Sequence, residues 1–416
     1  MRNSPFWWVF IGFMVLLDFY FFQALKTIAQ TTSPKAKMII YIGYWAISAG
    51  AIIVLIILPY LQFENQTKLI KNTLFACIAG LFFGKLIASV FFLVDDVRRM
   101  IQFVAGKVMY SSTEGEALQQ GEGISRSIFL SWAGMLMGGG LFGTLLYGFS
   151  NKYNYQFKKL QLAFENLPSS FRGLKIIHIS DIHSGSFTDK NAVHKGVQKI
   201  LDQKPDLILF TGDLVNNRHD EMNDYMDVFN KINAPLGVFS ILGNHDYGDY
   251  IHWDSEDEKM KNLEKLKEVH TALGWRLLLD ENIVLEKEGE KISIIGVQNI
   301  SGKSGFKSYG NLQKAYAGAK DHPFKILMSH DPSHWDSEVR LNYPDIDLML
   351  AGHTHGMQFG VEIAGFKWSP VQYIYKQWAG LYLEGSQKLY VNRGFGFIGY
   401  PGRVGILPEI TIIELV

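Results

Sequence analysis

The chain has 416 residues, of which 48% are hydrophobic and 19% are charged, and its 40 basic and 40 acidic side chains give a formal net charge of zero. Balanced charge without a basic tract or nucleic-acid motif gives no support to a nucleic-acid partner. The single cysteine excludes a disulfide framework and a zinc site built from thiolates.

Four long apolar segments dominate residues 1–150, namely 6–24, 38–61, 69–94 and 128–149. A helix needs about 20 such residues to cross the hydrocarbon core of a bilayer. A cleaved signal peptide accounts for at most the first segment. The sequence therefore predicts a four-helix transmembrane domain over residues 1–150, a short connector, and a soluble domain over residues 155–416.

Small residues recur at every fourth position in the third and fourth segments, a spacing that lets helix backbones approach closely in lipid. They are Ala76, Gly80, Gly84 and Ala88 in the third segment, and the pairs Gly134/Gly138 and Gly139/Gly143 in the fourth. We expect close helix packing there, with the general abundance of glycine in membrane helices as the alternative explanation.

Two ionisable residues, Asp18 and Lys85, lie a few positions past the midpoints of the first and third segments. These two helices run in the same direction, so the two charges lie at matching depths. An unpaired charge at mid-membrane costs about 2.5–3.5 kcal/mol on insertion scales. We expect the two to pair, with separate snorkelling or water contact as the alternative.

The side of the membrane that carries the soluble domain is poorly specified, because positive charge normally marks the cytoplasmic face and both sides carry it here. The side of the soluble domain has Arg2, Lys68, Lys71, Lys152, Lys158 and Lys159, and the other side has Lys26, Lys35, Lys37, Arg98, Arg99, Lys107 and Arg126. We expect an integral protein of the plasma or inner membrane, with a slight preference for a cytoplasmic soluble domain.

The soluble part contains short apolar runs that read as strands buried on both faces. They are residues 174–179, 207–210, 238–242, 326–328 and 348–351, and helical spacing marks residues 193–201, 222–232 and 263–273 between them. Each strand is followed by a polar motif. Open α/β sheets hold their sites at such strand ends, so we expect the motifs to cluster.

Those motifs contain the residue types that two adjacent metal ions require. They are Asp181-Ile182-His183, Gly212-Asp213, Gly243-Asn244-His245-Asp246, Ser329-His330 and Gly352-His353-Thr354-His355. Two cations about 3.5–4 Å apart neutralise a phosphoester and activate water. A bridging carboxylate, several neutral imidazoles and an uncharged amide suit such a pair. Alternate residues of an extended segment share a face, so His353 and His355 could serve neighbouring ions.

The order of these motifs resembles that of the calcineurin-like metallophosphoesterases over approximately residues 155–416. The residues that flank these motifs are similar to those of the membrane-associated, YkuE/YaeI-like branch. That narrower likeness lies in Ile176-Ile177-His178-Ile179-Ser180-Asp181-Ile182-His183, in Gly352-His353-Thr354-His355-Gly356 and in the tail from Asn392-Arg393-Gly394-Phe395-Gly396 through Arg403 to Pro408-Glu409-Ile410. The resemblance implies a four-layer αββα sandwich with metals held by loops at one edge.

The resemblance also implies roles for individual residues. Asp181, His183, Asp213 and His355 would bind one ion, and Asp213, Asn244, His330 and His353 the other, with Asp213 as the bridge. His245 would be a catalytic histidine that binds no metal, and Asp246 would either orient it or cap the next turn. A hydroxide shared by the ions would attack phosphorus in line. Nitrogen and oxygen ligands suit Mn, Fe, Zn and Co alike.

Arg393 and Arg403 are candidate substrate-binding residues, because guanidinium groups clamp phosphate with two parallel hydrogen bonds. The alternative is that the glycines of this tail form a tight loop with the arginines exposed. Two departures from the branch pattern, Met357 where a second glycine is usual and Gln298 near a position that is often acidic, leave the substrate contacts open.

The sequence therefore predicts a membrane-anchored dimetal phosphoesterase that cleaves a phosphodiester, phosphomonoester or pyrophosphate bond. A lipid-linked phosphoester is the substrate that a membrane domain favours, since it holds the site near a bilayer. One alternative is a non-catalytic scaffold or sensor that retains the fold, and another is a transporter with a regulatory phosphoesterase domain. The oligomeric state is not specified.

Overall fold

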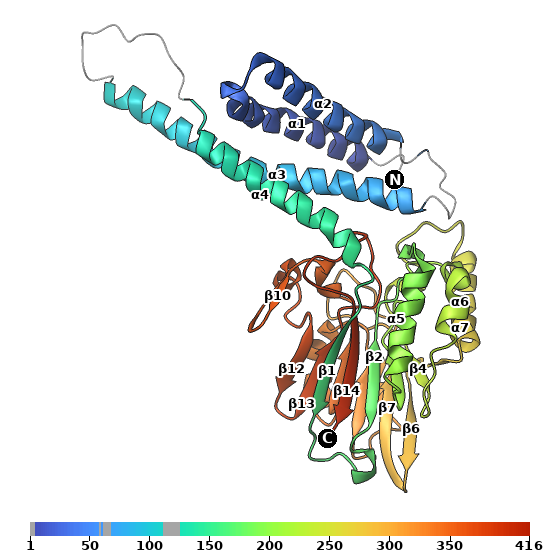
Figure 1. The fold of residues 1–416 in the computed structure, drawn as a ribbon. Coiled ribbons are helices and arrows are strands. Elements are labelled where there is room, and N and C mark those ends of the chain that lie inside the picture. Colours follow the sequence, from blue (N-terminus) through green and yellow to red (C-terminus); the bar gives the residue numbers. More distant parts are fainter. Residues whose placement is uncertain (1–4, 58–59, 61–67, 111–124) are drawn as a thin grey trace. The chain divides into compact units, whose positions relative to one another are not determined.

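The structure is a computed structural model that describes residues 5–57, 60, 68–110 and 125–416 (Figure 1). The chain divides into two compact units, Met1–Tyr147 and Gly148–Val416. Each unit has its own hydrophobic clusters, so each is described by itself.

The first unit is built from helices that are long and apolar enough to cross a membrane. They are α1 (Pro5–Ile28), α2 (Pro34–Ile57), α3 (Lys68–Tyr110) and α4 (Ile128–Gly148). The predicted four-helix transmembrane domain is confirmed. Part of the predicted segment 38–61 lies outside the described residues, and so does Arg2, which precedes the first predicted segment.

Helix α3 is much longer than the apolar segment that predicted it. Its 43 residues span about 64 Å at 1.5 Å per residue, about twice the thickness of a hydrocarbon core. The extension begins at Asp95 and Asp96, which pair one turn later with Arg98 at 2.9 Å and Arg99 at 3.0 Å. Ion pairs at this spacing support a helix outside the apolar region.

The closest approach between α3 and α4 lies at Gly84 and Gly138. A Cβ atom on Gly138 would lie 2.2 Å from the Gly84 carbonyl oxygen, and one on Gly84 would lie 2.8 Å from the Gly138 oxygen. The expected close packing is therefore confirmed at this crossing. By contrast, a Cβ on Gly139 or Gly143 would meet nothing within 4 Å, so that second glycine pair makes no close contact among the described residues.

The Lys85 ammonium forms an ion pair with the Asp18 carboxylate inside this unit, as predicted. Ser48 Oγ donates to Asp18 Oδ1 at 3.0 Å and accepts from Lys85 Nζ at 2.8 Å, while the Tyr44 hydroxyl donates to the Asp18 carbonyl oxygen at 2.8 Å. Charges at membrane depth are stabilised by such partners. The network joins residues of α1, α2 and α3.

The second unit contains two six-stranded mixed sheets. The first has the order β1 (Gln156–Leu162), β14 (Glu409–Leu415), β2 (Lys175–Ile179), β3 (Leu207–Phe210), β4 (Val238–Ser240) and β5 (Arg276–Leu277). The second has the order β12 (Gly380–Glu384), β13 (Gln387–Val391), β9 (Leu348–Ala351), β8 (Lys325–Met328), β7 (Glu290–Gly296) and β6 (Glu281–Lys287).

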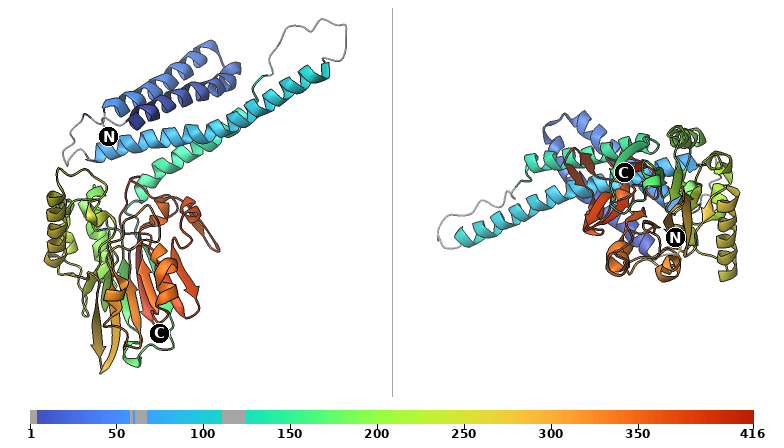
Figure 2. Two further views of the ribbon diagram at one scale, coloured as in Figure 1. Left: turned by 180° about the vertical axis from the view of Figure 1, so that it is seen from behind. Right: turned by 90° about the horizontal axis from the view of Figure 1, so that it is seen from below.

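Alternating side chains divide the core into three layers of packing. Figure 2 shows the sheets and helices of this unit from behind and from below. Ile176 of β2 points into the core between the sheets, while its neighbour Ile177 packs in the cluster that contains the outer helices. Helices α5 (Lys190–Asp202), α6 (Met226–Phe229) and α7 (Glu256–Ala272) cover the first sheet, and α8 (Leu312–Tyr316) packs on the second. The four-layer αββα sandwich is confirmed.

Strand and helix boundaries follow the local sequence signals closely. The five predicted strands are present. Asp189 and Ser255 cap α5 and α7 by accepting hydrogen bonds from the backbone amides of Ala192 and Glu258. The continuous helix predicted over 222–232 is wrong. Residues His219–Tyr225 form a 3-10 helix, and the non-helical backbone of Tyr225 (φ −121°) separates it from the single turn of α6.

Candidate metal centre

The predicted metal ligands come from loops at the carboxyl ends of five parallel strands, two sheets contributing to one cluster. Asp181 follows β2, Asp213 follows β3, Asn244 follows β4, His330 follows β8, and His353 and His355 follow β9. Parallel strands end at the same edge of a sheet. The fold therefore brings together residues that lie up to 174 positions apart in the sequence.

Five of the seven predicted ligands have a left-handed backbone, with φ of 52° at Asp181, 49° at His183, 60° at Asp213, 72° at His353 and 50° at His355. Residues other than glycine rarely adopt this conformation, and it costs of order 1–3 kcal/mol each. The two histidines of the last motif therefore reach neighbouring groups through a turn, rather than by the strand alternation expected from the sequence.

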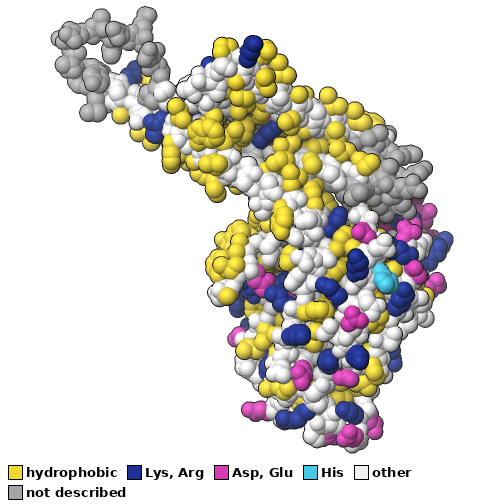
Figure 3. Space-filling view, viewed as in Figure 1, with side chains coloured by type: hydrophobic (Ala, Val, Ile, Leu, Met, Phe, Trp, Pro, Cys, Tyr) yellow, Lys and Arg dark blue, Asp and Glu magenta, His cyan; other side chains and the backbone are white. Residues whose placement is uncertain are grey.

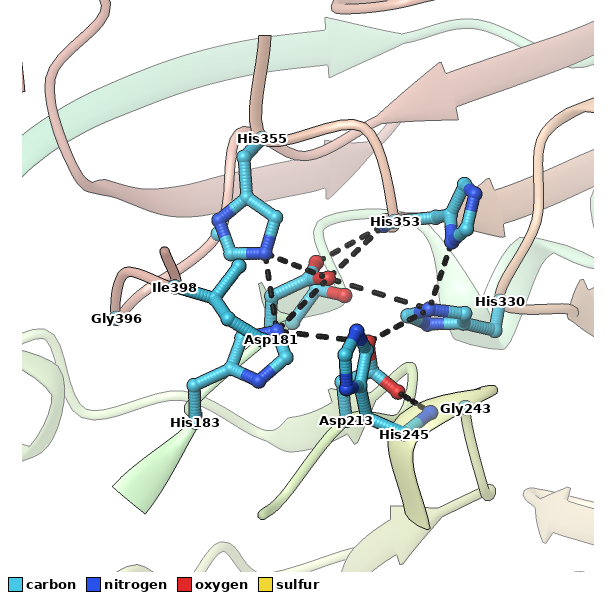
Figure 4. A network of polar contacts seen from close by, with 12 residues as sticks. Asp181, His183, Asp213, Gly243, His245, His330, His353, His355, Gly396 and Ile398 are labelled. Atoms are coloured by element: carbon cyan, nitrogen blue, oxygen red, sulfur yellow. Dashed lines mark hydrogen bonds and ion pairs between the residues drawn. The ribbon is translucent and has the colours of Figure 1, made fainter. Parts of the chain in front are cut away.

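One group consists of Asp181, His183 and His355, whose ligand atoms lie within 4.8 Å of one another. The Nε2 atoms of the two imidazoles lie 3.0 Å apart, and Asp181 Oδ1 lies 3.2 Å from that of His355 (Figure 4). His183 Nδ1 lies 3.1 Å from the Asn216 amide oxygen. A proton on Nδ1 directed at that oxygen leaves Nε2 free to bind a cation.

The second group is Asp181, Asp213 and His330. Asp213 Oδ2 lies 3.2 Å from His330 Nε2 and also 3.4 Å from His183 Nε2, so this carboxylate faces both groups of side chains. Asp181 belongs to both groups as well, so the geometry offers two carboxylates that could bridge. Asn244 Oδ1 completes this side, 3.1 Å from His330 Nε2 and 2.8 Å from His353 Nδ1.

The electrostatics of the cluster favour bound cations. Burial alone would raise the pKa of Asp181 and Asp213, but neighbouring histidines, His355 and His330 respectively, hold each pKa below its ordinary value. Burial lowers the pKa of His183 and His355. Burial alone would also lower the pKa of His330, but the Asp213 and Asp181 carboxylates raise it to about 10, so a cation bound there would displace a proton. Converging carboxylates and imidazoles are the donor set of a nitrogen and oxygen metal site, and the residues present therefore fit divalent ions.

His245 lies at the edge of this cluster, with its backbone amide donating to Asp213 Oδ1 at 2.8 Å. Its Nδ1 lies 2.8 Å from the Asn216 carbonyl oxygen, so Asn216 orients the ring. Asp246 does not orient His245. Its buried carboxylate instead accepts hydrogen bonds from the backbone amides of Gly243 and of the loop at 213–215. Neither expected role is therefore seen, because these donors lie before Asp246 in the chain and not in the turn that follows it.

The two arginines expected to bind substrate have other partners. Arg403 is fully buried. It donates to the carbonyl oxygens of His355 and Arg393 at 3.2 and 2.7 Å, and it donates to His355 Nδ1 at 3.2 Å. Arg393 forms ion pairs with Glu409 and Glu362. Neither guanidinium is exposed, so the alternative of a tight glycine loop with exposed arginines is wrong. The substrate role stays a prediction, and these contacts favour positioning roles.

Several supporting residues were missed by the sequence analysis. The Tyr375 hydroxyl lies 2.8 Å from His353 Nε2 and donates to Asp331 at 3.4 Å. The contact of Tyr375 with Nε2 orients the ring so that Nδ1 faces Asn244. The Tyr250 ring packs on His245 at 4.4 Å. Asp331 adjoins the Ser329-His330 motif, which is a signal that could have found it. Tyr375 has no such signal.

Comparisons with known proteins identify both parts of the chain. A family model described as calcineurin-like phosphoesterase matches residues 174–357. A second, described as the transmembrane domain of a probable calcineurin-like phosphoesterase, matches residues 1–152. Both matches agree with the two units of the structure.

Relatives share the second part. The metallophosphoesterase YkuE of Bacillus subtilis is 31% identical over 60% of this chain and 81% of its own length. A transmembrane protein with metallophosphoesterase domain from Danio rerio is 27% identical over 62% of this chain and 56% of its own length. Phosphodiesterase YaeI of Escherichia coli is 27% identical over 58% of this chain and 82% of its own length.

Proposed function

Because this chain belongs to the calcineurin-like phosphoesterases, in a membrane-associated branch, we propose that it is a metal-dependent phosphoric ester hydrolase. The observation that carries the proposal is the convergence of all seven predicted ligands, with His245 beside them, at one edge of the sandwich. We also propose that the catalytic domain extends over residues 155–416, since β14 lies between β1 and β2 in the first sheet.

The ligand roles follow the two groups of side chains. One divalent ion would be held by Asp181, His183 and His355, and the other by Asn244, His330 and His353, with Asp213 between them. When bound, such a pair supplies charge neutralisation and a nucleophile from water at neutral pH. Mn, Fe, Zn and Co all suit these donors.

The chain's own contribution to the chemistry centres on His245. Its Nδ1 proton is directed at the Asn216 carbonyl oxygen, so Nε2 can donate a hydrogen bond only when the ring is an imidazolium. In that state it would stabilise the phosphoryl oxygens or protonate the departing alcohol. Tyr250, packed on the ring and accepting from Asn244 Nδ2 at 2.7 Å, holds the same loop against the metal ligands.

The candidate substrates are phosphodiesters, phosphomonoesters and pyrophosphates, and we favour a lipid-linked one. Support comes from contacts at the end of α4, where the Gly148 carbonyl oxygen accepts a hydrogen bond from the Arg403 backbone amide at 2.9 Å. The side chain of Arg403 in turn reaches His355. Arg403 therefore contacts both Gly148, the first residue of the second unit, and the predicted ligand His355. We keep a cytoplasmic soluble domain as the working proposal.

The test is hydrolysis by the detergent-solubilised full-length protein of a chromogenic phosphodiester, a phosphomonoester and lipid-linked pyrophosphates, with Mn²⁺ or with EDTA. We expect turnover that requires the metal. His245→Ala should keep its metal content and lose about 10²–10⁴-fold in kcat, while Asp213→Asn should lose metal as well. His252→Ala, at an exposed histidine outside the site, is the matched control.

Metal analysis of the same samples separates the alternatives. Two ions bound per chain with no turnover on any substrate would support the non-catalytic scaffold or sensor instead. Unchanged kcat in His245→Ala would remove that residue from the mechanism while leaving the metal site in place.

A further inference from the structure

The β10–β11 hairpin (Val361–Ile363 and Phe366–Trp368) has one apolar and one charged face. Its cross-strand pairs are Val361 with Trp368, Glu362 with Lys367, and Ile363 with Phe366. Directly opposed residues point to the same side of a hairpin, and neighbours along a strand point to opposite sides. Four apolar side chains therefore share one face, and Glu362 and Lys367 share the other.

The charged face is the one turned toward the protein. Glu362 pairs with Lys158 of β1 and with Arg393, each at 2.9 Å, and Lys367 donates to the carbonyl oxygen of Ala379. Since both charged residues of the hairpin are engaged with other segments of this unit, the apolar face is left to point away from them.

The apolar face is exposed, with 43% of Val361, 65% of Ile363 and 54% of Phe366 accessible. The exposed apolar surface continues into the following turn, where Tyr373 is 77% and Ile374 56% accessible. Hydrophobic side chains gather over this hairpin in Figure 3. Water favours the opposite arrangement, with polar residues outward, and contiguous exposed apolar patches mark interaction sites.

We propose that this apolar face, together with Tyr373 and Ile374, docks into the interfacial layer of the bilayer that holds the four helices. Aliphatic residues beside Trp and Tyr are the composition of segments that lie at the membrane interface. Trp368 Nε1 donates to the Tyr373 hydroxyl at 3.4 Å, so the hairpin and the turn form one surface.

The path of the chain supports a bilayer as the occupant. The candidate span Ile128–Asn151 ends in a turn where Phe149 packs on Tyr400 at 5.6 Å and the Gly148 oxygen accepts from Arg403. The next residue, Val404, exchanges backbone hydrogen bonds with Gln358 and Gly360 at 2.8 and 2.9 Å. From Gly360 to Ile363 is at most about 11 Å of extended chain.

Docking would also place the metal site at the height of lipid headgroups. Ser369, directly after β11, donates to the Gly356 carbonyl oxygen at 2.8 Å, and Gly356 adjoins the predicted ligand His355. This consequence for the substrate rests on the proposed function. The docking itself does not, because it concerns only where the hairpin lies.

The experiment places a nitroxide spin label on single cysteines in full-length protein in lipid nanodiscs, after Cys77→Ala removes the native thiol. Labels at Val361→Cys and Ile363→Cys test the hairpin. Val284→Cys is the matched control, because this valine is 42% accessible on β6, at the edge of the second sheet opposite β12. Accessibility to oxygen, which concentrates in lipid, is compared with accessibility to a water-soluble nickel chelate.

We expect the hairpin labels to be several-fold more accessible to oxygen than to the nickel chelate, and the control label to show the reverse. Nickel accessibility at 361 and 363 equal to that at 284 would overturn the proposal. So would protection from both reagents, which would indicate contact with protein. The accessibility of the labels reports where the hairpin lies and does not depend on turnover. An inactive enzyme with lipid-exposed labels would therefore refute the proposed function and leave the docking intact.

Discussion

Single residues in this protein are held in positions that their local sequence does not favour. The left-handed backbone at five predicted ligands persists because surrounding hydrogen bonds determine it, such as those from the backbone amide of His353 to both Asp181 carboxylate oxygens at 3.1 and 3.0 Å. Strain of this kind gathers at functional sites. The Asp246 carboxylate likewise fixes the loop at 213–215 by accepting hydrogen bonds from its backbone amides. The motif that contains Asp246 does not indicate that these amides are its partners.

The Arg393–Glu409 pair offers a test at this scale. Both side chains are buried, so Arg393→Met leaves a carboxylate without its counter-charge. Such a change typically costs about 3–5 kcal/mol. We expect that loss when the unit Gly148–Val416 unfolds in chemical denaturation of the full-length protein, and we expect Arg393→Met/Glu409→Gln to recover most of it. A double variant as unstable as Arg393→Met would show that the charge pair is not the cause.

The same pair predicts a dependence of stability on pH. Burial alone would raise the pKa of Glu409, but Arg393 and the hydroxyls of Thr411 and Tyr390 hold it below its ordinary value. A carboxylate with a lowered pKa in the folded state contributes stability above its unfolded pKa and loses it as the pH falls through the folded value. The stability advantage over Glu409→Gln should therefore shrink in acid, and an advantage independent of pH would contradict this account.

At the scale of elements, the crossing of α3 and α4 depends on the absence of side-chain atoms at Gly138. We expect Gly138→Ala to destabilise the membrane domain by about 1–3 kcal/mol, as overpacking does, because its Cβ would meet the Gly84 carbonyl oxygen. The adjacent Gly139→Ala meets nothing and should be neutral or stabilising by up to about 1 kcal/mol. Unfolding in detergent, followed by helical circular dichroism, measures both, and equal effects would refute the crossing.

The Asp18–Lys85 pair joins α1 to α3 and predicts non-additive mutations. Asp18→Asn or Lys85→Met alone leaves one charge at membrane depth without its partner, whereas the double change leaves none. We expect each single variant to lower the unfolding midpoint. In a double-mutant cycle, the double variant should lose less stability than the sum of the two single losses. Strict additivity would indicate that the two side chains do not interact in the membrane.

For the whole molecule, metal loading should act on one unit. The ionised carboxylates and strained loops of the site lie entirely within Gly148–Val416, so Mn²⁺ should raise the unfolding temperature of this part. A free concentration about 100-fold above Kd adds about 2.7 kcal/mol when only the folded state binds. Scanning calorimetry with Mn²⁺ or EDTA measures the shift, with Asp213→Asn as the control that should lose it. A uniform shift in both units would contradict a local effect.

Much of this protein could be predicted from its sequence because the relevant signals are local. The length of an apolar segment determines whether a helix can cross a bilayer, and a buried run followed by Asp or His places a ligand at a strand end. The position of the predicted ligands in one cluster followed from those local signals. Even Asp18 and Lys85 could be paired, since helix direction and depth are both readable from the order of the segments.

Only the tertiary structure decided which distant segments meet. Hydrophobic periodicity shows that a face is buried but not what covers it, so the parallel pairing of β1 with β14 and the contact of Arg403 with His355 could not be predicted. The short alternation at residues 361–368 predicts two faces, yet the engagement of Glu362 by Arg393 turns the charged face inward. The orientation of that hairpin is set by a partner 31 residues away, which no local pattern contains.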